Sequence, residues 1–324
     1  MPVENFQKSC TIAIVTWNSA REIADCLAPL AALPETWQVW VADNASADDT
    51  ISIIKEKFPF VKVIANNDNR GFAEACNQIA DSTSSDFVLY LNPDSIAAPV
   101  ELEKALNEIV ADPEIGVLGV KIIDAAGNLQ KTCYKYPTLF NSFVEKLGVH
   151  RFFSANQKRE FMLGDFFDHL TSRETDWFYG AFMLSRREAI EKVGGIPEDY
   201  FLFAEDLDFC YRVRQAGYKI WFYSDAEIVH KGNQSAGQLP SEWRVERTLL
   251  SKYAFCFIHF GWLRTRLIQL IDLSANYIEA AIVRMRRPEL LFESGVKIYR
   301  KFNKKALKMS RAEIFTLLRK RPET

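Results

Sequence analysis

Acidic side chains lie at the ends of two predicted strands of this 324-residue chain, Asp43 at the end of Trp37–Asp43 and Asp94 after the apolar run Phe87–Leu91. Asp94 follows the run Phe87–Leu91 and the interrupting pair Asn92-Pro93. Because proline cannot donate to a sheet, we expect the chain to leave the sheet there, in the crevice where open α/β folds bind ligands. A carboxylate in that place is suited to hold a divalent cation against a diphosphate. Taken alone, Asp94 more simply turns the chain or caps the helix predicted over Pro99–Val110.

A second acidic group lies near the start of a helix predicted over Phe201–Gln215. Glu205, Asp206 and Asp208 are three acids within four residues. Negative charge is favourable at a helix N-terminus, and Asp208 can pair with Arg212 one turn later, so part of the cluster has a structural reason. That reason does not require all three acids. One of them is therefore a candidate for the general base that takes a proton from an acceptor hydroxyl.

Three further side chains could bind a nucleotide or a metal. Asp43 could accept a hydrogen bond from the N3–H of a uracil or thymine, and Arg70 offers a planar fork of donors to phosphate or base. His230 ends a short predicted strand, where an imidazole could bind a metal. Each also has a plain structural interpretation, as a turn residue, a solvated loop charge and a structural histidine.

Strands and helices alternate in the N-terminal part of the chain. This alternation predicts right-handed crossovers and a mainly parallel sheet covered on both faces, with the polar C-terminal strand ends along one edge. The predicted strands are Thr11–Trp17, Trp37–Asp43, Val61–Ala65 and Phe87–Leu91, and the helices between them are Ala20–Leu33, Thr50–Phe58 and Phe72–Ser82.

The middle of the chain is less regular. Ile115–Ile123 is predicted to be a strand, whereas Leu129–Thr175 lacks periodicity and is either irregular or an inserted helical lid. Asp176–Ser185 is predicted to be a strand interrupted at Gly180, where a small residue lets backbone or ligand approach closely. A turn, a helix and two short strands complete this part, over Asp124–Asn128, Arg186–Val193, Lys219–Tyr223 and Glu227–His230.

The C-terminal part is helical from Ser241 onward. Leu263, Leu267, Leu270 and Ile278 keep the spacing of an amphipathic helix. Arg284–Thr324 holds thirteen Lys or Arg against four Glu, a net charge of +9 in a chain whose net charge is −2. We expect these helices either to bind an anionic membrane surface or to pack against the body or a second subunit.

Missing motifs disfavour several classes of protein. The turn Trp17–Glu22 has no glycine, which argues against the dinucleotide fingerprint of nicotinamide dehydrogenases, and no P-loop motif occurs. The six cysteines stand singly without a CxxC pair, which predicts a reducing, cytosolic compartment. We find no charged-then-apolar leader and no apolar run of about eighteen residues. Together with the basic tail Arg284–Thr324, this predicts peripheral attachment to the inner face of the plasma membrane.

Seven segments in order resemble glycosyltransferase family 2, with the GT-A fold, over about Thr11–Ser235. The set is most similar to rhamnosyltransferase-like enzymes that build O-antigens and other bacterial surface polysaccharides. The segments are IVTWN at Ile14–Asn18, VADNASADDT at Val41–Thr50, NRGFAEACN at Asn69–Asn77, LNPD at Leu91–Asp94, WFYGAFMLSRREAIEKVGG at Trp177–Gly195, FLFAEDLDFCYRVRQAGY at Phe201–Tyr218 and IVHKGNQS at Ile228–Ser235.

The resemblance implies a role for individual positions at the metal and nucleotide sites. Asp94 would be the surviving acidic ligand of the family's DxD element, whose first acid is Asn92 here, and His230 would be a second ligand of Mg²⁺ or Mn²⁺. With Asn92 in place of an acid, the cation would be held by fewer anionic ligands. The nucleotide-binding positions would be Thr16, Asn18, Asp43, Arg70 and Asn92.

The resemblance also implies the reaction. Asp206 would be the catalytic base of an inverting single displacement, with Glu205 beside it, and Trp177 and Gly180 would shape the sugar and acceptor site. The donor would be dTDP-rhamnose, with a UDP-hexose or UDP-galactofuranose left open. The acceptor would be a saccharide or a polyprenyl-diphosphate-linked saccharide. A non-catalytic sugar-nucleotide-binding scaffold is the competing interpretation, no nucleic-acid partner is expected, and a homodimer is left open.

The same resemblance implies a division into parts. Residues 1–240 would form the GT-A catalytic domain, with a nucleotide-binding half over about 1–124 and an acceptor-binding half over about 125–240. Residues 241–324 would form a basic, amphipathic helical extension. We therefore predict an α/β protein with a mainly parallel, Rossmann-like central sheet and a C-terminal helical extension.

Overall fold

The structure is a computed structural model that describes residues 8–232, 239–286 and 296–318. Its described residues form two compact units. The first unit takes them from Met1–Tyr134, Asp168–Glu198 and Glu205–Gln238, and the second from Lys135–Phe167, Asp199–Ala204 and Leu239–Thr324. Two parts of the sequence interpretation lie outside the described residues, namely 233–235 of the last family segment and 287–295 with 319–324 of the basic tail.

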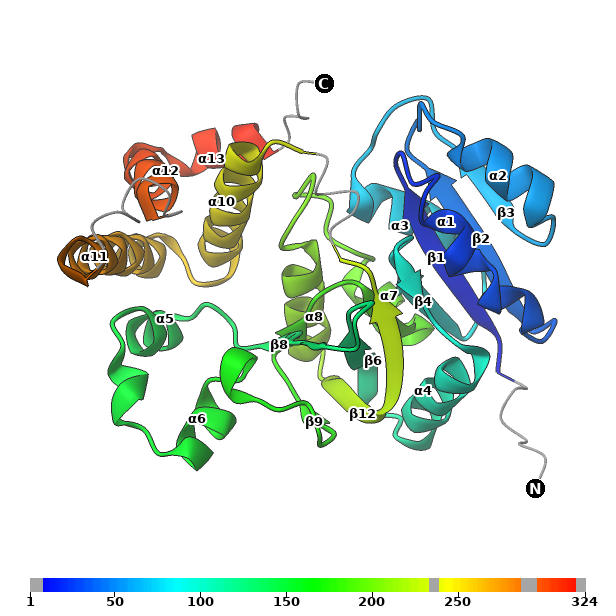
Figure 1. The fold of residues 1–324 in the computed structure, drawn as a ribbon, viewed down its shortest axis with the longest axis horizontal. Coiled ribbons are helices and arrows are strands. Elements are labelled where there is room, and N and C mark those ends of the chain that lie inside the picture. The colour runs from blue at the N-terminus through cyan, green and yellow to red at the C-terminus, as the bar shows by residue number, and fades with distance from the viewer. Residues whose placement is uncertain (1–7, 233–238, 287–295, 319–324) are drawn as a thin grey trace. The chain divides into compact units, whose positions relative to one another are not determined.

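A twisted, mainly parallel sheet is the centre of the first unit (Figure 1). Its strand order is β3-β2-β1-β4-β11-β6-β12-β5, with β7 added to β6 and β9 added to β12. β1, β2, β3 and β4 run parallel to one another, β6 runs parallel to β12, and β11 is antiparallel to both β4 and β6. The strands are β1 Cys10–Thr16, β2 Trp37–Asp43, β3 Lys62–Ala65, β4 Phe87–Leu91, β5 Ser95–Ile96, β6 Ile115–Ile123, β7 Leu129–Gln130, β9 Arg173–Glu174, β11 Phe182–Arg186 and β12 Lys219–His230.

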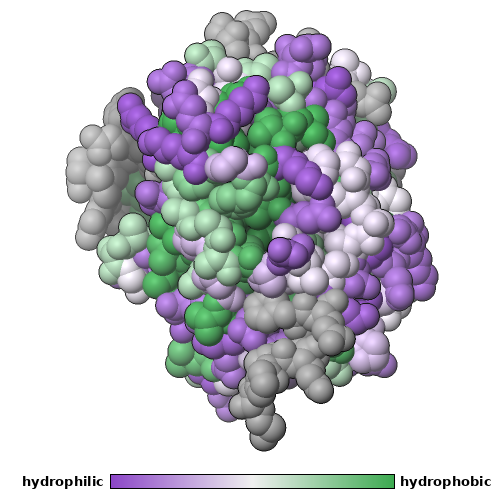
Figure 2. Space-filling model, turned by 90° about the vertical axis from the view of Figure 1, so that its right-hand side faces the viewer, coloured by the Kyte–Doolittle hydropathy of each residue, from purple (hydrophilic) through white to green (hydrophobic). Residues whose placement is uncertain are grey.

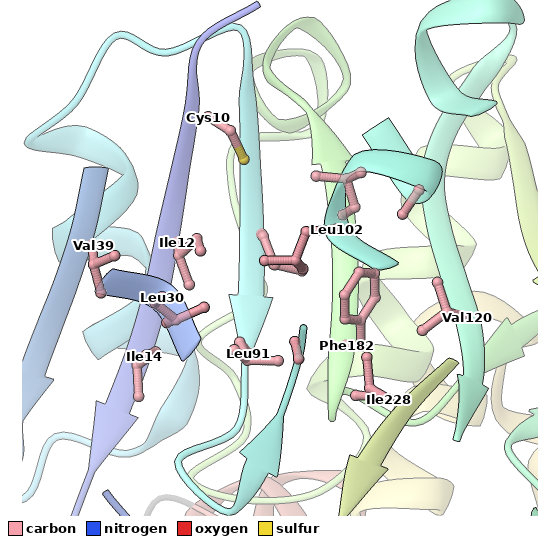
Figure 3. Close-up of a cluster of buried hydrophobic side chains, with 14 of the residues drawn as sticks. Cys10, Ile12, Ile14, Leu30, Val39, Leu91, Leu102, Val120, Phe182 and Ile228 are labelled. Atoms are coloured by element: carbon pink, nitrogen blue, oxygen red, sulfur yellow. The ribbon is translucent and has the colours of Figure 1, made fainter. Parts of the chain in front are cut away.

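Helices cover both faces of this sheet. Alternate side chains of β1 go to opposite faces, since Ile12 and Ile14 pack with one group of helices and Ala13 and Val15 with the other. Figure 3 shows the first of these two cores, formed with α1, α2 and α4. The second core is formed with α3, α7 and α8. The helices are α1 Ile23–Leu27, α2 Thr50–Lys57, α3 Phe72–Asp81, α4 Pro99–Ala111, α7 Arg187–Val193 and α8 Glu205–Gln215.

These features confirm the predicted fold class. β2, β4 and β6 occupy the predicted ranges to the residue. The helix predicted over Ala20–Leu33 is instead α1 followed by a short 3₁₀ turn, η2 (Pro29–Ala32). Pro29 is the reason, because proline cannot donate the hydrogen bond that would continue α1.

Two predicted elements near the site differ from the structure. Asp176–Ser185 is not one strand, because β10 (Trp177–Phe178) pairs with β8 (Cys133–Tyr134) in a separate two-stranded sheet, whereas β11 belongs to the main sheet. α8 begins at Glu205 and not at Phe201. Phe203 and Ala204 have φ values of 71° and 69°, a left-handed backbone that no right-handed helix can contain.

β12 is one strand where two short strands were predicted. It contains a register shift between Tyr223 and Glu227, residues that pair with the consecutive residues Val120 and Lys121 of β6. Ser224, Asp225 and Ala226 therefore form a bulge that has no counterpart on β6. Beyond the bulge, His230 pairs with Ser95 of β5.

The second unit is helical. The irregular stretch Leu129–Thr175 contributes α5 (Leu139–Lys146) and α6 (Ala155–Phe161), with the 3₁₀ turns η3 (Val149–Phe152) and η4 (Gly164–Phe166). The described residues of the C-terminal part form the helices α10 (Ser241–His259), α11 (Trp262–Arg286), α12 (Val296–Lys308) and α13 (Arg311–Leu318).

A buried polar network joins three helices of the second unit. Asp272 of α11 accepts hydrogen bonds from Lys252 (2.7 Å) and from the hydroxyl of Tyr253 (2.9 Å), both on α10, and that hydroxyl also contacts Asn303 of α12.

None of the helices in the described ranges combines the length and the apolar character that a membrane span needs. Figure 2 shows the face on the right of Figure 1, where hydrophilic side chains surround a patch of hydrophobic ones.

Candidate functional site

The parallel strands β1, β2 and β4 end at one edge of the sheet, and Asp43 lies at the tip of β2. Its buried carboxylate accepts three hydrogen bonds, from Thr16 Oγ1 (2.7 Å), Ser46 Oγ (2.5 Å) and the backbone N–H of Ser46 (2.9 Å). Thr16 ends β1, so these bonds tie the two strand ends together. Asp43 therefore holds the loop that follows β2 against the end of β1.

Asn18 strengthens this connection from the loop after β1. It has a φ of 50°, a left-handed conformation that asparagine tolerates better than most residues. Its Oδ1 accepts from the N–H of Ala47 (2.8 Å), and its own N–H donates to Ser46 Oγ (2.8 Å). The structure thus brings together three predicted nucleotide-binding residues, Thr16, Asn18 and Asp43.

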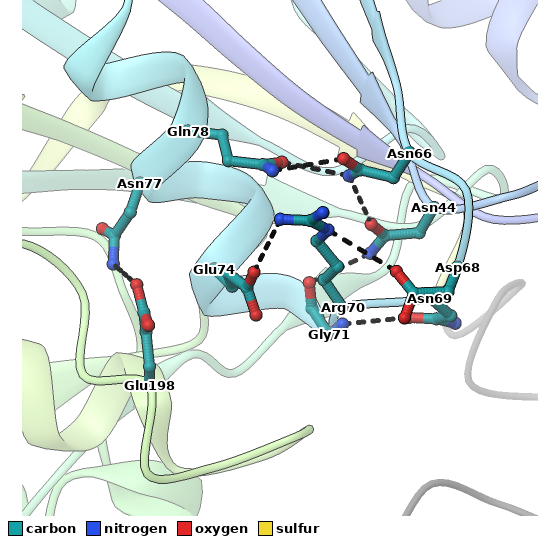
Figure 4. A network of polar contacts seen from close by, with 10 residues as sticks. All are labelled: Asn44, Asn66, Asp68, Asn69, Arg70, Gly71, Glu74, Asn77, Gln78 and Glu198. Atoms are coloured by element: carbon teal, nitrogen blue, oxygen red, sulfur yellow. Dashed lines mark hydrogen bonds and ion pairs between the residues drawn. The ribbon is translucent and has the colours of Figure 1, made fainter.

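Arg70 lies in the loop before α3, where Figure 4 shows its surroundings. Its guanidinium contacts Glu74 (3.0 Å) and Asp68 (3.5 Å), and the side chain is exposed. Asn44 Nδ2 donates to the carbonyl of Gly71 (3.0 Å), which holds this loop beside the end of β2. Arg70 therefore stands near Asp43 in the fold, with its charge already balanced by two carboxylates.

A second cluster joins the end of β4 to the end of β12. His230 Nε2 lies 3.2 Å from Asp94 Oδ1 and 3.5 Å from Asn92 Nδ2. The pairing of His230 with Ser95 explains this meeting, because Ser95 follows Asp94 directly. Asp94 is buried, so its carboxylate is shielded from water. The structure thus brings His230 together with Asn92 and Asp94, from which more than a hundred residues separate it in the sequence.

Gln130 determines which nitrogen of His230 carries a proton. Its Nε2 donates to the carbonyl of His230 (2.7 Å), so its Oε1 must face His230 Nδ1, at 2.9 Å. Because an amide oxygen only accepts, Nδ1 carries a proton, and in the neutral imidazole Nε2 directs its lone pair toward Asp94. A lone pair and a carboxylate oxygen at 3.2 Å attract each other only with a cation between them, a proton or a metal ion.

The donor set of this cluster fits a divalent cation. A carboxylate oxygen and an imidazole nitrogen are ligands that Mn²⁺ accepts, and a second hydrogen bond that orients the imidazole is the usual support of a histidine ligand. Within the described ranges no group of three or more His, Cys, Asp or Glu side chains could hold a metal ion. Asp94 and His230 would therefore share the ion with oxygen atoms of a bound diphosphate or with water.

Sequence reasoning missed Gln130. It follows the turn Asp124–Asn128, and β7 brings it back beside β6 through the pairing of Gln130 with Ile122. A two-residue strand has no periodicity to recognise, and Gln130 carries no motif. Only the register of the turn places it against His230.

The acids at the start of α8 have different environments. Asp208 is fully buried and pairs with Arg212 (2.9 Å), which is the structural role that the spacing allowed. Glu205 is buried, and among the described residues its Oε2 meets no hydrogen-bond partner. Asp206 is partly exposed, and its two oxygens accept from the N–H of Leu207 (2.7 Å) and of Gly180 (3.0 Å).

Burial shifts the titration of two of these acids. It raises the pKa of Glu205 to about 8, helped by the neighbouring charge of Asp206. It also raises the pKa of Asp206, to about 6, against the lowering effect of the N–H groups of Leu207 and Gly180. At neutral pH Glu205 is therefore mostly protonated and Asp206 mostly ionised. The pair presents one neutral acid and one carboxylate that can take a proton.

Gly180 and Trp177 lie beside this pair. A Cβ on Gly180 would lie 3.6 Å from Cβ of Asp206, so even the smallest side chain would fill the space that separates them. Trp177 contacts the rings of Tyr134 and Tyr179, with centroids 5.3 and 5.5 Å away. Both tyrosines were missed from the sequence, although the apolar, aromatic run around Trp177 could have indicated Tyr179.

One short segment connects the two acidic clusters. The N–H of Asn92 donates to the carbonyl of Ala181 (3.1 Å). The N–H of Gly180, the residue before Ala181, donates to the carboxylate of Asp206. The chain at Gly180-Ala181 therefore fixes the start of α8 relative to the end of β4. This arrangement suits chemistry in which a base acts on one of two substrates and a cation acts on the other.

Comparison with known proteins identifies a family model and several relatives that this chain resembles. Residues 11–194, more than half of the chain, match the model of the family Glycosyl transferase family 2. The N-acetylglucosaminyl-diphospho-decaprenol L-rhamnosyltransferase of Mycobacterium tuberculosis is 26% identical over 79% of this chain and 87% of its own length. The O-antigen chain rhamnosyltransferase WbaN of Salmonella anatum is 26% identical over 62% of this chain and 58% of its own length.

Solved structures agree on the fold. The mannosyltransferase PcManGT of Pyrobaculum calidifontis, solved with GDP-Man and Mn²⁺, superposes with a TM-score of 0.57 at 18% identity, over 96% of this chain and 86% of its own. GalNAc-T7, solved with UDP, GalNAc and Mn²⁺, gives a TM-score of 0.58 at 14% identity, over 95% and 56%. The matched family model, the rhamnosyltransferase relatives and the shared architecture together establish that this chain belongs to glycosyltransferase family 2 and is rhamnosyltransferase-like.

Proposed function

We propose that this glycosyltransferase moves L-rhamnose from dTDP-rhamnose to a hydroxyl of a saccharide, or of a lipid-linked saccharide, with inversion at the anomeric carbon. The partly exposed carboxylate of Asp206, each of whose oxygens accepts from one backbone N–H group, is the observation that carries the reaction type, and burial raises its pKa. The rhamnosyltransferase relatives support the donor sugar, and the name of the mycobacterial relative supports a polyprenyl-diphosphate acceptor.

In the proposed mechanism Asp206 accepts the proton of the acceptor hydroxyl as that oxygen attacks the anomeric carbon. The bond from this carbon to the diphosphate oxygen breaks on the opposite face, and the electron pair leaves with the nucleoside diphosphate. The N–H groups of Gly180 and Leu207 hold one oxygen of Asp206 each, so the carboxylate is oriented before substrate binds. Glu205, protonated at neutral pH, adds no second negative charge beside it.

We assign the cation site to Asp94 and His230, with Asn92 beside them and Gln130 as the residue that positions His230. A divalent cation, Mg²⁺ or Mn²⁺, supplies charge stabilisation to the leaving diphosphate when it is bound there. Asp94 contributes the negative charge, and the bond from His230 Nδ1 to Gln130 keeps the lone pair of Nε2 available. Thr16, Asn18, Asp43 and Arg70 are assigned to the nucleotide, within a nucleotide-binding half over about 1–124.

Gln130→Leu tests the positioning of His230, because it removes both hydrogen bonds to that residue and nearly preserves side-chain size. We expect Mn²⁺ affinity to fall about 10- to 100-fold, the usual effect of losing a partner of a metal ligand. Electron paramagnetic resonance monitors how Mn²⁺ divides between protein and buffer with dTDP present. It measures the Mn²⁺ affinity without an activity assay. Gln38→Leu, on the exposed side of β2, is the matched control. Unchanged Mn²⁺ affinity in Gln130→Leu would remove Gln130 from this role.

The donor and the stereochemistry are tested together. Purified protein is incubated with dTDP-rhamnose, UDP-glucose or UDP-galactofuranose and a lipid-linked N-acetylglucosamine acceptor, and the product anomer is determined by NMR. We expect transfer from dTDP-rhamnose with inversion. Transfer from a UDP-sugar alone would reassign the donor, retention would contradict the single displacement, and nucleotide-sugar binding without transfer or hydrolysis would favour a scaffold.

We further propose that the protein works as a peripheral protein at the inner face of the plasma membrane. A lipid-linked acceptor would be anchored there, and the basic residues of α12 would meet anionic headgroups. The division at residue 240 between a catalytic domain and a C-terminal extension is kept as part of this proposal, with the acceptor-binding half over about 125–240 and the extension over 241–324.

A further inference from the structure

We infer that the exposed apolar face formed by α5 and α11 is the surface by which this protein docks on an anionic membrane leaflet. The inference deepens the membrane association proposed above, and it rests on the second unit alone. It assigns the docking to apolar side chains of two helices, one of them in the stretch that sequence periodicity left undefined.

The polarity of α11 is reversed compared with that of an ordinary surface helix. Its side chains that face the interior of the second unit include the fully buried Thr265 and Gln269 and the nearly buried Asp272. The opposite side of the helix carries a stripe of apolar residues with helical spacing. These are Leu263, Leu267, Leu270, Ile278 and Met285, and 39% to 76% of each is exposed. In water such a stripe normally packs inward, so its exposure indicates an apolar partner.

α5 extends the same apolar surface. Phe140 and Phe143 of α5 are 65% and 46% exposed. Together with Leu147 they line an open groove of about 630 Å³ whose other wall is Leu267, Leu270 and Ile271 of α11. Single exposed apolar residues are common, but a groove with apolar side chains on both walls is a binding surface in the usual case.

Cations border this surface on the side of α12. Arg300 and Lys304 lie over the ring of Tyr277 of α11, 5.4 and 5.1 Å from its centroid, and among the described residues neither pairs with an acid. The next residues along, Lys301 and Lys305, face α10 and pair with Glu242 and Glu246. α12 therefore neutralises one row of its cations within the unit and leaves the other row beside the apolar stripe.

An apolar stripe with cations along its edge matches an anionic lipid surface. Acyl chains meet the leucines and phenylalanines, and the headgroup phosphates meet Arg300 and Lys304, as in interfacial amphipathic helices. A second copy of the chain matches less well. Apposition of the same face on two molecules would offer the cations of each α12 no carboxylate from the groove of the partner, because the residues that line the groove include none.

The full-length protein is tested for binding to vesicles that contain phosphatidylglycerol, with neutral phosphatidylcholine vesicles in parallel. The main variant, Phe143→Glu with Leu270→Glu, places one charge on each wall of the groove. Phe60→Glu with Leu129→Glu adds the same charge at two exposed positions of the first unit and is the matched control. Circular dichroism and thermal melting check that each variant is folded.

We expect the groove variant to bind anionic vesicles at least about tenfold more weakly than the wild type, whereas the control binds as the wild type does. Arg300→Gln with Lys304→Gln should weaken binding to anionic vesicles and leave weak binding to neutral vesicles unchanged. Wild-type binding by a folded groove variant would overturn the inference. A concentration-dependent dimer that the groove variant abolishes would assign the face to a second copy.

Activity on a water-soluble acceptor separates this inference from the proposed function. We expect Leu270→Glu alone, which lies outside the acceptor-binding half over about 125–240, to keep its transfer rate on such an acceptor while it binds vesicles more weakly. Loss of both in a folded variant would contradict a role confined to docking. Vesicle binding by a wild-type protein that transfers no sugar would support the docking surface and contradict only the proposed reaction.

Discussion

Asp43 and Asp206 are both carboxylates at the boundary of a regular element, and the structure treats them in opposite ways. Asp43, at the tip of β2, is fully buried and accepts hydrogen bonds from two hydroxyls and one N–H. Asp206, in the first turn of α8, is partly exposed, accepts from two N–H groups, and has a pKa raised by burial. The first carboxylate is used to hold the backbone, and the second remains able to take a proton.

Asp206→Asn should give the largest effect, because it removes the proton acceptor and keeps the shape of the side chain. We expect kcat to fall about 10²- to 10⁴-fold. Asp225→Asn, an exposed change on the β12 bulge, is the control for the loss of one charge. Steady-state kinetics with dTDP-rhamnose measure both variants, and a folded Asp206→Asn enzyme with near-normal turnover would end the proposed role of Asp206.

The pH dependence of the rate should reflect the ionisation of the same carboxylate, that of Asp206. Burial raises the pKa of Asp206 to about 6, so the ionised base is lost as pH falls through that value. We expect kcat/KM to drop about tenfold per pH unit on the acid side of about pH 6. A profile that stays flat down to pH 5 in a protein that remains folded would contradict this assignment. A stopped assay over pH 5 to 8 suffices for the measurement.

Thr16→Val tests the scaffolding role of Asp43. It keeps the shape of the side chain and removes a hydrogen bond to a buried carboxylate, so we expect the free energy of unfolding to fall by about 1–3 kcal/mol. Thr248→Val is the matched control, because that exposed hydroxyl bonds only a carbonyl of its own helix. Urea denaturation measures both variants. Equal midpoints would show that Asp43 does not depend on Thr16.

Glu205→Gln should give the smallest effect and depend on pH. Because burial raises the pKa of Glu205 from 4.5 to about 8, the folded protein favours its protonated form, and the corresponding stability is lost progressively as pH rises from about 4.5 to about 8. Glutamine resembles the protonated acid. The melting temperature of the variant should therefore exceed that of the wild type by a few degrees at pH 8.5 and by little at pH 5.5. A constant difference across this range would contradict the raised pKa.

The sequence predicts those elements whose ends are marked by neighbouring residues in the chain. β2 and β4 are apolar runs that end in turn residues, so their ranges follow from composition alone. The positions of Asp43 and Asp94 at strand ends follow from the same runs, and that of His230 follows from the short run Glu227–His230. Their roles came from the family resemblance, since each residue by itself allows a structural interpretation.

The sequence could not predict the contacts that depend on pairing between distant segments. Gln130 reaches His230 through the register of a two-residue strand, and Trp177 joins Tyr134 because β10 leaves the main sheet. α11 gives a second example of this limit. Its apolar spacing was evident, but periodicity does not tell which side of a helix faces the interior, and the buried Gln269 and Asp272 show that here the polar side does.

The bulge in β12 makes that strand unequally tolerant of changes in length. Ser224, Asp225 and Ala226 have no partners on β6, so the gain or loss of one residue among them can be absorbed while Glu227 keeps its place opposite Lys121. Between Glu227 and Val229 the same change would reverse the alternation of the strand and turn the imidazole of His230 to the other face of the sheet. Between Tyr223 and His230, insertions and deletions compatible with a working cation site are therefore confined to the bulge, which directly precedes the segment they would disrupt.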